Sequence, residues 1–252
     1  KETNSPKNLK TTIAGESLFN DGVGVVVFSV ILSIILSQGS SLNASEIAIL
    51  FAEEAIGGVV YGLLLGYVFY RLLKSIDNYP LEIMLTLALV MGGYSLSYNL
   101  PFHIHVSGPL AMVVSGLFIG NHGKMFAMSE ATHTQLFSFW ELIDEFLNAL
   151  LFVLIGFQFM NISFNLNFIY SSIILIPIIL VIRFCGIKLV LFSLRSNNNL
   201  TKGSSYVMTW CGLRGGISIA LALSLDSALK NSPEIYHLIL SVTYIVVAFS
   251  IV

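Results

Sequence analysis

Eight runs of about 20 mostly apolar residues follow one another along the chain of 252 residues. A helix rises ~1.5 Å per residue, so a run of ~20 residues can cross the ~30 Å hydrocarbon layer of a membrane. We therefore predict an all-α, polytopic membrane protein with about eight transmembrane helices. The runs lie near 13–37, 47–73, 81–100, 106–121, 138–159, 167–193, 204–225 and 235–252.

The composition excludes several other classes of protein. Only 10% of the residues are charged and the mean hydropathy is +0.85, whereas about a quarter of a soluble domain is charged. The net charge of -2 offers no basic surface for nucleic acid. The runs lack the alternation of ~10-residue segments that marks a membrane β-barrel. Cys185 and Cys211 lie inside apolar runs, so we expect their thiols to be buried. We also expect residues 1–252 to form a single transmembrane domain.

Lysine and arginine residues gather on alternate loops between the runs. Eight lie on one side of the predicted membrane and only Lys230 lies on the other. Because basic residues favour the cytoplasmic face, we predict a multi-pass protein with both chain ends in the cytoplasm. The eight are Lys1, Lys7, Lys10, Arg71, Lys74, Lys124, Arg195 and Lys202.

A few charged residues lie deep inside the runs, where an unpaired charge costs at least ~2.5–3.5 kcal/mol. Counting from the ends of their runs, Asp21, Arg183 and Arg214 can reach the midplane. Lys188 is close enough to the cytoplasmic end for its long side chain to reach water. Each deep charge is therefore a candidate functional residue. Carboxylates also occur in the first two runs at Glu16, Glu53 and Glu54.

The first run carries a stripe of polar residues at helical spacing. Ser17, Asn20 and Asp21 fall on one face at i, i+3 and i+4. They offer hydroxyl, amide and carboxylate oxygens, which suit a proton or a small cation bound transiently at Asp21. We predict an ion-binding site here. The alternative is that Asn20 and Asp21 only form hydrogen bonds between helices.

Glycines surround the arginine of the seventh run. Gly212, Gly215 and Gly216 flank Arg214, which predicts a broken helix whose freed carbonyl and amide groups line a polar cavity. Many secondary transporters build their substrate site from such helices. The alternative is that the glycines are close packing contacts and that Arg214 pairs with a carboxylate.

Arg183 needs a buried anion as a partner. Glu16 is the best candidate, since Asp21 has to remain available for its own ligand. A buried pair that loses one partner leaves an uncompensated charge worth about 3–5 kcal/mol. We therefore expect the pair of Glu16 and Arg183 to hold two helices in register rather than to carry ions.

Taken together, these motifs resemble the monovalent cation:proton antiporter family, the NhaP and NHE type of sodium/proton exchanger. The resemblance implies that Asp21 binds ions and protons beside Asn20, that Glu16 pairs with Arg183, and that the glycine-rich segment belongs to the core. It also implies a homodimer in the plasma membrane. The matching blocks run from Gly15 to Val23, His105 to Leu110, Phe139 to Glu141, Leu147 to Asn148, Leu154 to Gly156 and Gly212 to Gly215.

The family is built as an inverted repeat, and its Asn-Asp helix normally follows several others. Here that helix comes first, so we expect the chain to be the C-terminal part of the transmembrane transporter domain. The function implied is exchange of Na⁺, or Li⁺ or K⁺, for protons that compete at Asp21. Enzyme motifs are absent and we expect no cofactor. The alternatives are a cation channel and a membrane scaffold that transports nothing.

Overall fold

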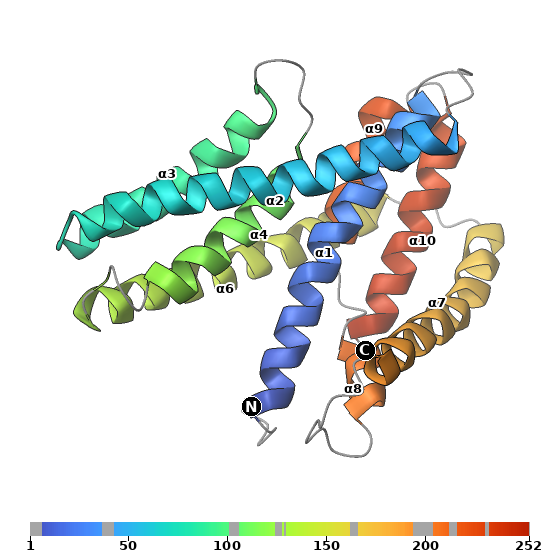
Figure 1. The fold of residues 1–252 in the computed structure, drawn as a ribbon. Helices are drawn as coiled ribbons and strands as arrows, with labels where there is room; N and C mark the ends of the chain where they lie inside the picture. The colour runs from blue at the N-terminus through green and yellow to red at the C-terminus, as the bar shows by residue number, and fades with distance from the viewer. Residues whose placement is uncertain are drawn as a thin grey trace. The chain divides into compact units, whose positions relative to one another are not determined.

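The computed structural model describes residues 7–36, 43–100, 106–123, 128, 130–161, 166–193, 204–211, 216–229 and 232–251. All regular structure in these ranges is helical, which confirms the predicted all-α class (Figure 1). The elements are α1 (Lys7–Leu36), α2 (Ala44–Lys74), α3 (Tyr79–Ser97), α4 (Gly108–Phe118), η2 (Ile119–Gly123), α6 (Glu130–Asn161), α7 (Leu166–Ser193), α8 (Ser204–Cys211), α9 (Gly216–Ala228) and α10 (Pro233–Ile251).

Each of the eight predicted runs coincides with helical structure. The fourth run is divided into α4 and the π-helical turn η2, and the seventh into α8 and α9. Five helices of the described chain are long and apolar enough to cross a membrane, which supports a polytopic membrane protein. They are Thr11–Leu36, Ser45–Lys74, Tyr79–Ser97, Tyr170–Val190 and Pro233–Ser250.

Local sequence determines where several helices begin. The Ser107 hydroxyl accepts a hydrogen bond from Leu110 N at 3.4 Å and caps α4, in which Pro109 occupies the first turn. The amide of Asn43 donates to Glu46 Oε2 at 2.8 Å at the start of α2. α6 begins at Glu130, earlier than the predicted 138, since its first turns are polar and give no apolar signal.

The chain divides into two compact units, Leu18–Leu147 and the pair of segments Lys1–Ser17 and Asn148–Val252. Within the first unit α2 packs closely on α4. Gly58, Gly62 and Gly66 face α4 at intervals of four residues, and a Cβ on Gly62 would lie 2.5 Å from Ala111 O. The glycines therefore let the backbones of α2 and α4 approach each other closely, as small residues do in other membrane helix bundles.

The second unit contains the start of α1, the C-terminal part of α6, and α7 to α10. α10 packs against both α7 and α9, and α7 packs against α8. The core between α9 and α10 is apolar and consists of Ile219, Ala222, Leu240, Tyr244 and Val247.

Much of α7 presents bare apolar side chains, with Val181 61% exposed and Ile182 66% exposed. Within the described part of the chain, no other helix covers this face. The free thiol of Cys185 shares the exposure. The prediction that Cys185 is buried is therefore wrong, because an apolar run in a membrane helix can face lipid as well as protein.

Candidate functional site

α1 carries the predicted ion-binding residues. Ser17 and Asp21 are half-buried, one turn apart on the same helix, while Asn20 is exposed. Directly beyond Asp21, Gly22 is buried, and a Cβ there would lie 3.3 Å from Leu110 Cδ1 in the first turn of α4. The backbone of α1 thus approaches α4 closely beside the carboxylate.

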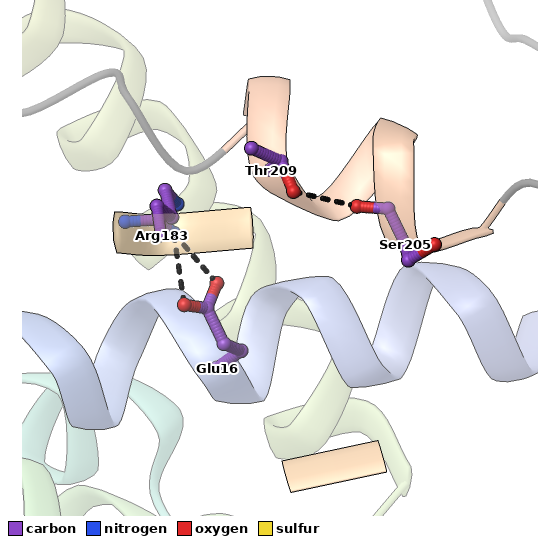
Figure 2. Close-up of polar contacts among 4 residues, drawn as sticks. All are labelled: Glu16, Arg183, Ser205 and Thr209. Atoms are coloured by element: carbon purple, nitrogen blue, oxygen red, sulfur yellow. Dashed lines mark hydrogen bonds and ion pairs between the residues drawn. The ribbon is translucent and has the colours of Figure 1, made fainter. Parts of the chain in front are cut away.

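Glu16 and Arg183 are brought together by the fold, although 167 positions separate them in the chain. Arg183 Nη2 donates to Glu16 Oε1 at 2.8 Å and to Oε2 at 3.1 Å (Figure 2). The Arg183 side chain is 16% exposed and that of Glu16 is 27% exposed. Arg183 Nε is buried and has no hydrogen-bond partner. The ion pair therefore joins α1 to α7 with a single guanidinium nitrogen.

Apolar side chains support this ion pair from three helices. Ile187 of α7 and Met208 of α8 form a buried cluster, and Ile13 of α1 packs against it. Ile13 lies three residues before Glu16 and Ile187 lies four residues after Arg183, about one helical turn in each case. Partial exclusion of water here strengthens the attraction between the two charges.

The neighbouring polar groups of α8 do not join the ion pair. Thr209 Oγ1 donates to Ser205 O at 2.7 Å, within α8 itself (Figure 2). Hydroxyl groups that bond to their own helix backbone in this way are satisfied without a partner from another helix. In the described part of the chain, the Glu16 carboxylate and the Arg183 guanidinium thus bond to each other and not to the hydroxyl groups of α8.

Replacing Arg183 by methionine is expected to destabilise the protein strongly. The substitution keeps the volume of the side chain but leaves the Glu16 carboxylate without its cation, a change worth about 3–5 kcal/mol in buried pairs. The midpoint of thermal unfolding in detergent should fall clearly. Glu16→Gln combined with Arg183→Met should recover most of the loss, because no unpaired charge remains.

Lys188→Met is the matched control for this experiment. Lys188 is an exposed cation on the same helix, with Nζ 4.6 Å from the centre of the Phe184 ring. Its loss should change the unfolding midpoint little, since exposed charges contribute little to stability. If the double variant were as unstable as the sum of its two single variants, the ion pair would not be what holds α1 to α7.

The predicted broken-helix core lies mostly outside the described residues. This holds for Gly212, Arg214 and Gly215, so the break stays a prediction. Gly216 begins α9 and is half-buried, and a Cβ there would lie 2.6 Å from Leu151 Cδ1. Gly216 thus serves as a close contact with the C-terminal part of α6.

Sequence reasoning missed one buried carboxylate, Glu82, in the first turn of α3. It is fully buried, accepts a hydrogen bond from Thr132 Oγ1 at 3.3 Å, and has no partner for Oε2. Four residues later, Thr86 Oγ1 accepts from Trp140 Nε1 at 3.1 Å. The available signal was a carboxylate and a hydroxyl one turn apart within an apolar run, which marks a face directed at protein rather than lipid.

In the described part of the chain, no three His, Cys, Asp or Glu side chains gather to hold a metal ion. On α1, Ser17 and Asp21 are both half-buried and carry a hydroxyl and a carboxylate. A single carboxylate with neutral oxygens is the kind of donor set that a hard monovalent cation accepts, since such cations prefer oxygen.

These features define a polytopic helical membrane protein with a half-buried carboxylate, Asp21, on α1 and an ion pair that joins α1 to α7. A family model described as "Sodium/hydrogen exchanger, transmembrane" matches residues 1–252. The chain belongs to the sodium/hydrogen exchanger family, as its motifs predicted.

The curated relatives carry matching names. The Na⁺/H⁺ antiporter NhaP of Pseudomonas aeruginosa is 49% identical over 255 residues, covering 100% of this chain and 58% of the relative. NhaH of Halobacillus aidingensis is 35% identical and covers 98% of this chain and 59% of the relative. The low-affinity antiporter NhaS1 of Synechocystis sp. is 34% identical over 96% of this chain and 46% of the relative. The chain thus spans roughly half the length of these antiporters.

Proposed function

We propose that the protein is a secondary active transporter that exchanges Na⁺ for H⁺, and that Asp21 is the carboxylate for which the two cations compete. The observation that carries this proposal is the position of Asp21: half-buried and ~15 Å along an apolar helix long enough to cross a membrane. The names of the relatives support Na⁺ and H⁺ as the transported ions.

In the proposed cycle, Asp21 binds either a proton or a cation, but never both. Binding of one displaces the other, so competition alone couples the two fluxes. Ser17, one turn away, supplies a hydroxyl oxygen, and Asn20 is the neutral neighbour. Because one charge replaces one charge at a single carboxylate, the expected exchange is electroneutral. A current that tracks exchange in reconstituted protein would contradict this stoichiometry.

In this mechanism Glu16 and Arg183 act structurally. Their ion pair fixes α1 against α7, so that Asp21 keeps its place while its ligand changes. Arg183 already contacts a carboxylate and is not required to neutralise Asp21. Gly212, Arg214, Gly215 and Gly216 would belong to the core that surrounds the site.

The remaining parts of the proposal concern the whole protein. Residues 1–252 form one transporter domain in the plasma membrane, with both ends on the cytoplasmic side as the loop charges predict. Li⁺ and K⁺ are further candidates for transport, and the full-length protein forms a homodimer.

Proton flux in vesicles tests the transport activity directly. Full-length protein is reconstituted with a pH-sensitive dye inside, and Na⁺, Li⁺ or K⁺ is added outside. An antiporter should release internal protons in a saturable manner that depends on the cation added. Flux that does not saturate and follows the membrane potential would instead indicate a cation channel, and absence of any flux would favour a scaffold.

A further inference from the structure

A cavity of about 290 Å³ opens between α3, the segment formed by α4 and η2, and the N-terminal part of α6. It lies entirely within the unit Leu18–Leu147, and Asp21, Glu16 and Arg183 are not among the residues that line it. Among the residues that line it are Thr86, Leu89, Gly116, Gly120, Phe137 and Trp140. A ligand bound here would therefore contact three helices that the ion pair does not join.

The walls of the cavity offer nothing to a charged or hydrated ligand. The indole of Trp140 donates to Thr86 Oγ1 at 3.1 Å, and Thr86 Oγ1 in turn donates to Ile83 O at 2.9 Å. The polar side chains that line the cavity thus satisfy each other, and no charged side chain takes part. Because a buried polar ligand without partners is costly, the cavity suits a hydrocarbon.

The position of the cavity indicates where such a hydrocarbon comes from. Thr86 and Val90 lie near the middle of the span Tyr79–Ser97, at the depth of the lipid tails. Val90 is 38% exposed and Phe137 is 45% exposed, so apolar side chains form the rim. An apolar rim at this depth of a bilayer admits an acyl chain more readily than water.

The last turn of α2, which packs on two residues of the cavity wall, also carries basic residues. Leu89 and Ile119 line it and form a buried cluster with Leu73 of α2. Arg71 and Lys74 lie in the same last turn of α2 as Leu73, and both are exposed. The same two residues belong to the loops predicted to face the cytoplasm. Anionic headgroups of the cytoplasmic leaflet attract cations at this depth.

We propose that the cavity binds one acyl chain of an anionic phospholipid whose headgroup lies near Arg71 and Lys74. The chain fills the space between α3 and α6, which are joined beside the cavity by the Trp140–Thr86 bond and one turn away by the Thr132–Glu82 bond. A bound lipid therefore stabilises α6 against α3. This site does not depend on which cation is transported at Asp21.

Two glycines provide a way to close the cavity without disturbing the fold. Gly116 and Gly120 line it, and a Cβ added to either would meet no atom within 4 Å. Gly116→Leu should therefore fold while filling the space meant for lipid, and Gly120→Leu fills it from η2. Gly92→Leu is the matched control, because Gly92 lies on α3 with equally open space but does not line the cavity.

Photolabelling tests the proposal. Full-length protein is reconstituted with phosphatidylglycerol that carries a diazirine in one acyl chain, irradiated, and mapped by peptide mass spectrometry. Label should concentrate on residues 86–90, 116–120 and 137–140, above the level on the exposed apolar face of α7. Gly116→Leu and Gly120→Leu should lose this labelling, and Gly92→Leu should keep it.

Two results would overturn the lipid site: label at the three segments no stronger than on α7, or unchanged labelling in both cavity-filling variants. The headgroup is tested with the matching phosphatidylcholine probe. Equal labelling by both probes would contradict the assignment of an anionic lipid. Replacing Arg71 and Lys74 by glutamine should bring labelling by phosphatidylglycerol down to the level of phosphatidylcholine.

Discussion

Asp21→Asn is expected to abolish cation-driven proton movement while the protein still folds. Asparagine has nearly the same shape as aspartate but cannot release a proton or offer a negative charge to a cation. Competition at the site is then lost, and exchange should fall to the level of vesicles without protein. The measurement is the initial rate of dye response after addition of Na⁺, with gel filtration of the variant as the test of folding.

Glu53→Gln is the control for Asp21→Asn. Glu53 is also a half-buried carboxylate in an apolar helix, α2, and the substitution makes the same chemical change. This variant should retain exchange, because the proposal places no ion at Glu53. If Asp21→Asn retained full exchange, Asp21 would not be the ion-binding carboxylate. The result for Glu53→Gln would not change that conclusion.

Gly62→Ala is expected to cause a large loss of stability from the addition of one methyl group. Its Cβ would lie 2.5 Å from Ala111 O, 2.9 Å from Ala111 Cα and 3.0 Å from Val114 Cβ. Two of these atoms belong to the backbone of α4, so no change of rotamer relieves the contact and the two helices must separate. Overpacking of this kind costs about 1–3 kcal/mol. Thermal unfolding in detergent should show a lower midpoint.

Gly92→Ala and Gly66→Ala set the scale for that measurement. Nothing lies within 4 Å of a Cβ on Gly92, so alanine there should raise the midpoint slightly through its higher helix propensity, worth up to about 1 kcal/mol. On Gly66 the nearest atoms lie at 3.2 Å, which predicts an effect between the other two. If Gly62→Ala changed the unfolding midpoint no more than Gly92→Ala does, the result would contradict the close approach of α2 to α4 at Gly62.

The helices themselves were predictable because every span of a membrane helix must be apolar over its whole length. Helix ends were less predictable. α6 starts at Glu130 because its first turns carry Thr132, Thr134 and Gln135, which give no apolar signal. The division of the fourth run into α4 and η2 was also missed, since a π-helical turn has no clear mark in the residue sequence.

The pairing of Glu16 with Arg183 followed from the cost of leaving either charge alone among apolar residues. That argument works because few charged residues compete as partners within the runs. The same argument did not identify Glu82 as a buried carboxylate. Its partner, Thr132, lies 50 positions away and carries a neutral hydroxyl group. A neutral partner cannot be selected by counting charges.

The sequence by itself determined the class of protein, the helices and the residues that carry charge into the membrane, because each of these depends on the cost of moving local groups from water into hydrocarbon. The tertiary structure decided which helices touch. Gly62 against Ala111, Thr86 against Trp140 and the cavity between α3 and α6 depend on the approach of segments far apart in the chain. Packing of this kind is a property of matching shapes, and no single stretch of sequence contains both halves of the match.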